Sequence, residues 1–295
     1  MEASAISFDP ETLARLKHLT VRSRFLLQGL SAGIHRGPKR GQSVEFSEHR
    51  EYSPGQETRL IDWKVFARSD RLFVKQFEEE TNLVVSLLVD HSRSMDYSSR
   101  PGKLTKWQYA QVASLTLAYL LLERRDSVAL GLIGDGQCSW VGHSSQRRHW
   151  QALVHHLDRA AWSGRSLLAE SMGVFSQRSH RRQMVLVLSD FLTDQDSLFR
   201  GLRFLRHQGH DLMLLRITDP QESRFEFHSP ARFQSLEGDG WEEVDPVQIA
   251  DTYRKVFLEH HRRLEAFCRS QGFGFSWVQT DQSLLDGVAK LLIDR

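Results

Sequence analysis

The stretch NLVVSLLVDHSRSM, residues 82–95, decides the fold. It begins with an unbroken run of mostly branched apolar residues, which is typical of a strand buried on both faces of a parallel sheet. The run stops at Asp90, and Ser92 and Ser94 follow at alternate positions. A buried strand therefore ends in one carboxylate and two hydroxyls, a combination that enzymes and metal-ion adhesion sites both use.

Strand and helix patterns alternate after this stretch. Thr105 is placed to cap a helix that we expect to run to about Glu123, and SVALGLIG (127–134) is predicted to form the next strand. A second buried strand, in QMVLVLSD, again ends in an aspartate, Asp190. The alternation predicts an α/β fold in which helices cover a doubly wound, mostly parallel sheet, and it ends with a helix predicted over residues 283–294.

The chain divides unevenly. After a helix predicted at residues 9–20, the chain up to about residue 80 lacks a sustained helical period and contains short alternating pieces between Gly-Pro and Pro-Gly turns. We expect residues 1–80 to form a small N-terminal module that contains strands, and residues 81–295 to form the α/β domain. Alternating aromatic and polar residues around a Gly-Asp-Gly turn predict a hairpin insertion near residues 221–245.

The composition of the chain excludes several classes of protein. With 295 residues, 40% of them hydrophobic, and a net charge of +2, the chain can bury a large core but has no strong overall field. Its two cysteines, Cys138 and Cys268, lack the spacing of a zinc site or a disulfide framework. The N-terminus has no signal-peptide pattern, and the longest apolar stretch, Val112–Leu122, is shorter than the roughly 20 residues that span a bilayer. We expect a cytoplasmic protein without a membrane span.

The residues that could bind a ligand lie at the ends of two predicted strands. In an open α/β sheet, ligands bind beyond the carboxyl ends of the strands, at the point where the strand order reverses. Asp90 and Asp190 each follow a buried strand, so we expect them to share one site. Ser92 and Ser94 can face the same point, and hydroxyls beside carboxylates are the hard oxygen ligands that suit magnesium or manganese.

These residues resemble the metal-ion-dependent adhesion site of von Willebrand factor A domains. That signature is Asp-x-Ser-x-Ser, then a Thr on a second loop and an Asp on a third; here DHSRSM matches the first part and Asp190 the third. In SGRSLLAES, Ser166 stands at the Thr position, while Leu167 replaces the acid that usually follows. The resemblance implies five metal ligands: Asp90, Ser92, Ser94, Ser166 and Asp190.

A longer resemblance lies upstream. Residues 44–80, VEFSEHREYSPGQETRLIDWKVFARSDRLFVKQFEEE, resemble the segment that precedes the A-like domain in a bacterial family called domain of unknown function 58. Members of that family are commonly encoded beside MoxR-type AAA+ ATPases and are thought to act with them as adaptors. The resemblance implies a non-enzymatic adaptor that binds such an ATPase and a client complex. Within this segment we expect a buried Trp63 and paired charges that join the module to the A-like domain, and a partner-binding surface is the alternative for the same motif.

Two other functions are open alternatives. Asp90 could be the nucleophile of a phosphoryl-transfer hydrolase, although Ser92 stands where such sites usually have a second carboxylate, and no Walker A, GxSxG or GxGxxG motif is present. Basic residues between Arg15 and Arg40, with no acid among them, could instead bind nucleic acid or an anionic membrane surface. The nearly balanced net charge argues against this last function, so we expect no nucleic-acid partner.

Overall fold

The computed structural model describes residues 44–52, 61–69, 71–79, 83–100, 102–161, 164, 166–179, 181–227, 231–234, 236 and 240–282. The helices predicted at residues 9–20 and 283–294, and the basic stretch between Arg15 and Arg40, lie outside these residues. The described residues fall into two compact units, a smaller one before Leu83 and a larger one from Leu83 onward.

The smaller unit contains a two-stranded sheet. In it, β1 (Val44–Glu51) pairs antiparallel with β2 (Phe73–Glu79). The pairing shifts register between Phe46 and Glu48, where β1 carries a bulge. This segment therefore forms strands, as the alternating pattern predicts.

A short helix, α2 (Trp63–Ser69), separates these strands in the sequence. Asp62 begins it, because its carboxylate accepts a hydrogen bond from the backbone N–H of Lys64 at 3.0 Å. Asp62 is buried, but the Trp63 side chain is 61% exposed and meets Phe66 edge-on at 6.1 Å between ring centroids. Within the smaller unit Trp63 is therefore exposed and not buried, since the helix begins with Asp62 turned inward and the next side chain turned out.

The larger unit is built on a six-stranded sheet in the order β10-β7-β6-β3-β4-β5. Every neighbouring pair is parallel except β4 and β5. The strand order reverses at β3, which lies between β4 and β6, so the predicted doubly wound, mostly parallel sheet is confirmed. The strands are β3 (Val84–Asp90), β4 (Ser127–Gly134), β5 (Gln137–Ser144), β6 (Met184–Ser189), β7 (Asp211–Thr218) and β10 (Gly274–Gln279).

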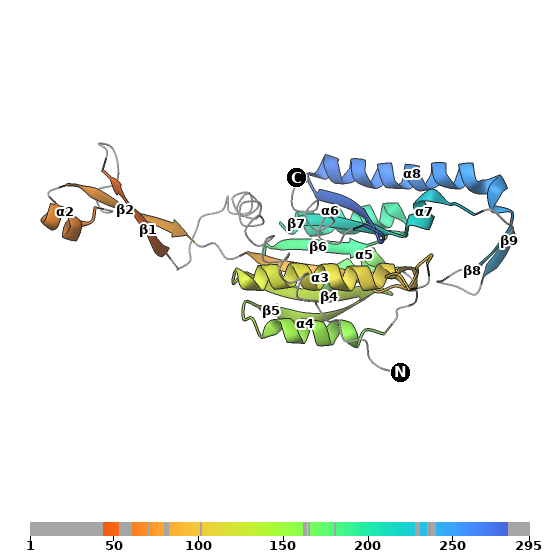
Figure 1. Ribbon diagram of the computed structural model, residues 1–295, viewed down its shortest axis with the longest axis horizontal. Coiled ribbons are helices and arrows are strands. Elements are labelled where there is room, and N and C mark those ends of the chain that lie inside the picture. Colours follow the sequence, from red (N-terminus) through yellow and green to blue (C-terminus); the bar gives the residue numbers. More distant parts are fainter. Residues whose placement is uncertain are drawn as a thin grey trace. The chain divides into compact units, whose positions relative to one another are not determined.

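Helices cover both faces of this sheet (Figure 1). One face packs against α3, and α4 lies beside α3. On the other face, α5, α6 and α8 share one apolar core with the strands, in which Phe175 lies in a cluster with Val187 and Leu214. The helices are α3 (Lys106–Glu123), α4 (His149–Asp158), α5 (Leu168–Arg178), α6 (Gln195–His207), α7 (Pro220–Arg224) and α8 (Pro246–Gln271).

Two elements of the larger unit were not expected from the sequence. β5 returns antiparallel to β4 through a tight turn in which Asp135 and Gly136 both have positive φ, 50° and 70°. It is an edge strand with several exposed side chains, so it lacks the apolar run that marks the central strands. The short helix α7 directly follows β7, at the start of the segment where only a hairpin insertion was expected.

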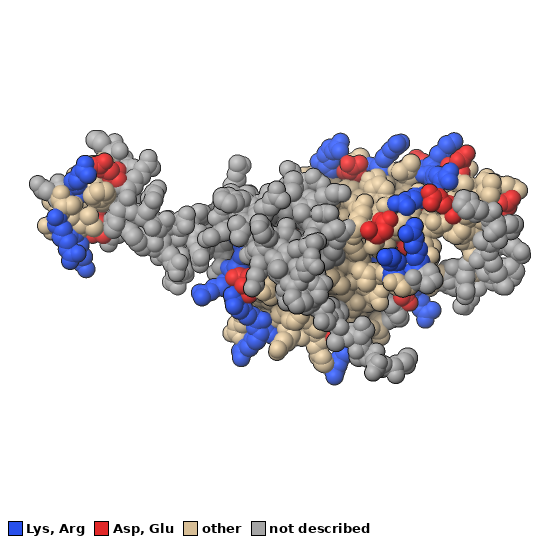
Figure 2. Space-filling view, viewed as in Figure 1, with Lys and Arg blue, Asp and Glu red and all other residues tan. Residues whose placement is uncertain are grey.

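A hairpin of β8 (Ala231–Gln234) and β9 (Trp241–Val244) falls within residues 221–245. On the face shown in Figure 2, basic and acidic side chains are interspersed along α8, so the visible side of this helix has no surface of a single sign. Among the described residues, no helix combines the length and the apolar character that crossing a bilayer requires.

Candidate functional site

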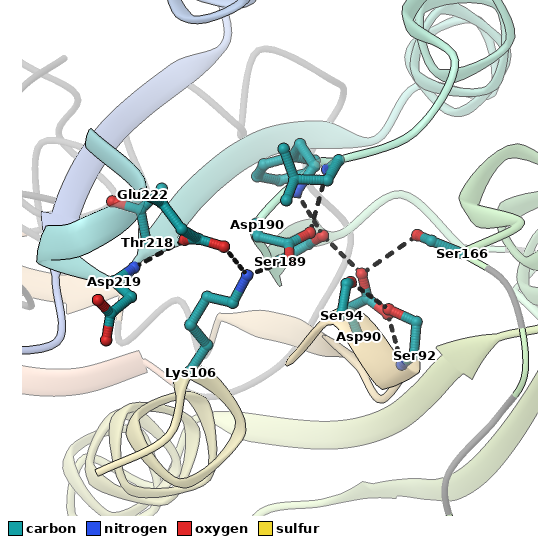
Figure 3. A network of polar contacts seen from close by, with 12 residues as sticks. Asp90, Ser92, Ser94, Lys106, Ser166, Ser189, Asp190, Thr218, Asp219 and Glu222 are labelled. Atoms are coloured by element: carbon teal, nitrogen blue, oxygen red, sulfur yellow. Dashed lines mark hydrogen bonds and ion pairs between the residues drawn. The ribbon is translucent and has the colours of Figure 1, made fainter. Parts of the chain in front are cut away.

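Asp90 and Asp190 lie at the same edge of the sheet. Asp90 is the last residue of β3 and Asp190 directly follows β6, and these two strands are parallel neighbours. Both side chains are completely buried. The structure therefore brings the two strand-end aspartates to one place, at the point where the strand order reverses (Figure 3).

The loop after β3 turns its serines toward the aspartates. The backbone N–H of Ser92 donates to Asp90 Oδ1 at 2.9 Å, which bends the chain back on the strand end. A single turn of 3₁₀ helix, η2 (Arg93–Met95), then places the Oγ atoms of Ser92 and Ser94 3.1 Å apart. Alternate positions in a turn thus present both hydroxyls to the same point.

Ser166 reaches this cluster from the loop before α5. Its hydroxyl donates to Asp90 Oδ2 at 3.4 Å, and its carbonyl oxygen accepts from Thr193 Oγ1 at 2.8 Å. The second contact ties the loop of Ser166 to the loop after β6. All five residues named from the sequence are therefore close together, whereas Leu167 is partly exposed and begins α5 without a side-chain cap.

Ser189 is a sixth polar residue of the cluster. Its hydroxyl donates to Asp90 Oδ2 at 2.6 Å and accepts from the backbone N–H of Phe191 at 2.8 Å. Phe191 has a positive φ of 55°, so the chain turns sharply just beyond Asp190. The only sequence signal for Ser189 is a hydroxyl at the end of an apolar run, next to the aspartate that the motif identifies.

Lys106 is the unexpected member of the site. Its Nζ lies 2.7 Å from Asp190 Oδ2 and 2.6 Å from Glu222 Oε1, and only 1% of the side chain is exposed. Lys106 is the first residue of α3, where the helix dipole disfavours a positive charge. That misfit is the one sequence signal that could have marked it.

Glu222 is held for this contact by its own helix. It is the third residue of α7, and its Oε2 accepts from the backbone N–H of Asp219 at 2.8 Å. Asp219 caps the helix in return and also accepts from the backbone N–H of Ser99 at 2.9 Å. A capping box therefore fixes the carboxylate that meets Lys106 and links α7 to the loop after η2.

The charges of the cluster are unevenly balanced. Burial and the nearby charge of Asp190 raise the pKa of Asp90 to about 7. Burial also acts to raise the pKa of Asp190, but the Lys106 ammonium outweighs it and holds that pKa below its ordinary value. Burial raises the pKa of Glu222 despite the same lysine. Asp190 is thus held as an anion by Lys106, whereas Asp90 forms no ion pair with a cationic side chain among the residues that the structure describes.

The donor set fits a hard divalent cation. Two carboxylates and three hydroxyls gather at one point, and magnesium and manganese prefer such oxygen ligands. Within the part of the chain that the structure describes, no three residues of the His, Cys, Asp and Glu types form a possible metal site. An ion at this point would be held by Asp90, Ser92, Ser94, Ser166 and Asp190.

The strand order, with helices on both faces, gives the larger unit the doubly wound, mostly parallel α/β fold that the sequence predicts. The chain belongs to the family described as "Protein of unknown function DUF58", whose model matches residues 48–266. This family assignment confirms the resemblance seen in residues 44–80.

Similar proteins span most of the chain. An uncharacterized protein of Mycobacterium bovis is 25% identical over 97% of this chain and 90% of its own length. BatB of Bacteroides thetaiotaomicron is 13% identical over 71% of this chain and 98% of that one, with a TM-score of 0.44. The SpRpn10 VWA domain is 11% identical over 71% of this chain and 94% of that one, with a TM-score of 0.41.

Proposed function

We propose that this protein is a non-enzymatic adaptor that binds other proteins through a metal ion of the magnesium class. The proposal rests chiefly on one observation, which is that Asp90 is buried without a paired positive charge among the described residues. Its carboxylate is fully buried and accepts hydroxyl hydrogen bonds, but among the described residues it forms no ion pair with a cationic side chain. A buried carboxylate without a countercharge is costly, and a divalent cation beside it would remove that cost.

Each residue of the cluster has a part in this proposal. Asp90 and Asp190 would supply the negative charge, and the hydroxyls of Ser92, Ser94 and Ser166 would complete the protein ligands. Lys106 orients Asp190 by holding its Oδ2, which leaves Oδ1 bonded to the backbone N–H of Leu192 at 3.0 Å. A bound ion would offer a free coordination position to a carboxylate of a partner.

The partner that we propose is a MoxR-type AAA+ ATPase, with which the protein would act in the assembly or maturation of a client complex. This part of the proposal rests on membership of the family and on the resemblance of residues 44–80. The cluster is compatible with it because a metal-held carboxylate contact can form and break without any covalent step.

Binding to the purified ATPase tests this function. The ATPase itself uses magnesium, so the metal concentration should stay constant while the adaptor is varied. We expect Asp90→Ala to weaken binding at least tenfold, and Asp96→Ala, in the exposed part of the same loop, to bind as the wild type does. Equal binding by wild type and Asp90→Ala would count against the proposal.

One observation favours a second candidate function. A phosphoryl-transfer hydrolase with an aspartate nucleophile uses a lysine to neutralise phosphate, and a lysine does lie in this network. However, Lys106 is occupied by Asp190 and Glu222, and the raised pKa of Asp90 leaves a smaller fraction of this side chain in the ionised, nucleophilic form near neutral pH. Turnover of p-nitrophenyl phosphate by wild type, abolished in Asp90→Asn, would establish the hydrolase instead.

A further inference from the structure

An apolar pocket opens beside the candidate metal site. Its volume is about 360 Å³, near the lower end of the range of roughly 300–1,000 Å³ typical of ligand pockets. Ser94 lines it, so the pocket begins at the cluster itself. The residues from outside the cluster that shape its wall are chiefly Leu192, Phe225, Phe227, Phe233, Leu236 and Tyr253.

Aromatic side chains from three segments build the wall. Phe225 has a positive φ of 48° at the end of α7, and it stacks on Tyr253 of α8 with ring centroids 4.1 Å apart. Phe227 lies 5.0 Å from Phe225, and Phe233 of the β8–β9 hairpin lies 5.3 Å from Phe227. These contacts form a preassembled aromatic surface, which binds large apolar groups with little loss of side-chain entropy.

Two leucines leave this surface open to solvent. Leu192, just after the cluster residue Asp190, is 40% exposed, and Leu236, between the hairpin strands, is 42% exposed. Both line the pocket. An apolar patch next to a polar site is a mark of a binding surface rather than of ordinary surface variation.

The charged groups of the pocket favour an apolar occupant. Lys106 and Glu222 also line it, but they are paired with each other at 2.6 Å, and Lys106 is also paired with Asp190. Neither group is free to take an anion or a cation from solution. Among the described lining residues, the pocket therefore offers apolar area and no unpaired charged side chain that would select a phosphate or an ammonium group.

We infer that this pocket takes a large apolar side chain of the same partner segment whose carboxylate reaches the metal site. The inference rests on the proposed function, since it assumes a carboxylate ligand at the cluster. Because Ser94 belongs to both sites, the two side chains should lie within about three residues of each other, at roughly 3.3 Å per residue of extended chain. The recognised feature is thus an acidic residue close to Phe, Trp, Leu, Ile or Met.

Peptide display on the full chain tests the inference. Random dodecapeptides on phage would be selected in magnesium and in EDTA against wild type, against Asp90→Ala and against the double variant Leu192→Ser/Leu236→Ser. Both leucines are partly exposed, so the double variant should fold. Phe204→Ser is the matched control, because Phe204 lies on α6 away from the pocket lining and is 47% exposed.

We expect wild type and Phe204→Ser to enrich peptides that pair an acid with a large apolar residue. The double variant should lose the apolar preference and bind the selected peptides about tenfold more weakly, while the acidic preference and the need for magnesium persist. Asp90→Ala should show the opposite pattern, with the apolar preference kept and the acidic one lost.

Other outcomes separate the two proposals. Magnesium-dependent acidic peptides without any apolar preference would overturn the pocket inference and leave the proposed function standing. Apolar peptides without an acid, selected equally in EDTA, would contradict the metal site and the linked recognition feature. Absence of enrichment in wild type would contradict both.

Discussion

At the scale of single residues, Lys106 determines how the charges of the site are distributed. Its single positive charge is shared by Asp190 and Glu222, and it makes no ion pair with Asp90, so the buried Asp90 carboxylate is the one that an added cation would stabilise most. The sequence identifies Asp90 and Asp190 because each ends an apolar strand and parallel strands end at a common edge. It does not identify Lys106, whose partners are 84 and 116 residues away and depend on how α3 and α7 pack.

Replacement of this lysine should make the protein depend on metal for its stability. In Lys106→Met, Asp190 and Glu222 lose their shared cation, so we expect a loss of about 3–5 kcal/mol in the free energy of unfolding. Magnesium should restore part of this loss and raise the melting temperature more than it does for wild type. Lys103→Met, at an exposed position three residues earlier, is the control. An unchanged melting temperature in Lys106→Met would contradict the charge balance described here.

A buried histidine away from the site predicts how stability depends on pH. Burial lowers the pKa of His210, and neither of its ring nitrogens has a hydrogen-bond partner in the described structure. The folded chain therefore keeps His210 neutral at pH values where the unfolded chain protonates it, so stability should fall as the pH drops below about 6.5.

Urea unfolding at pH 7.5 and pH 5 measures this effect. His210→Gln should lose less stability on acidification than wild type does, whereas His207→Gln, at an exposed position on α6, should match wild type. Equal pH dependence in wild type and His210→Gln would mean that another group governs the loss.

At the scale of elements, the start of α3 couples helix capping to the site. Thr105 accepts from the backbone N–H of Gln108 at 3.1 Å, and the Gln108 side chain accepts from the N–H of Thr105 at 3.0 Å. This capping box, predicted from Thr105, sets the first turn that carries Lys106. By contrast, β5 and α7 could not be predicted from apolar periodicity, because one is a partly exposed edge strand and the other has five residues.

Removal of this cap should weaken both the helix and the network. We expect Thr105→Ala to lower the free energy of unfolding by about 1 kcal/mol, within the usual range of about 0.5–2 kcal/mol. Thr105→Ser keeps a hydroxyl and should retain most of that stability. Chemical denaturation of wild type, Thr105→Ala and Thr105→Ser measures these differences. If Thr105→Ser were as unstable as Thr105→Ala, the hydroxyl would not be what stabilises the turn.

At the scale of the whole molecule, the doubly wound sheet explains how one short motif becomes a site. Asp90 ends β3, and the loop that follows carries Ser92 and Ser94. Ser189 ends β6 and Asp190 follows it, while Ser166 lies in the loop before α5. Sequence patterns predict that Asp90 and Asp190 converge, because parallel strands end at a common edge, but they do not predict the part of Ser189. They do not predict the aromatic pocket, since its wall combines α7, α8 and the hairpin, whose mutual packing no local pattern encodes.

The most direct test of the central claim is calorimetric titration of magnesium into chelator-treated protein. Asp90→Asn is the informative variant, because it keeps the shape of the buried side chain while removing its charge, and Asp96→Asn is the exposed control in the same loop. We predict one magnesium ion per chain for wild type and for Asp96→Asn, and no binding for Asp90→Asn. Absence of binding to wild type, or equal binding to Asp90→Asn, would contradict the metal site.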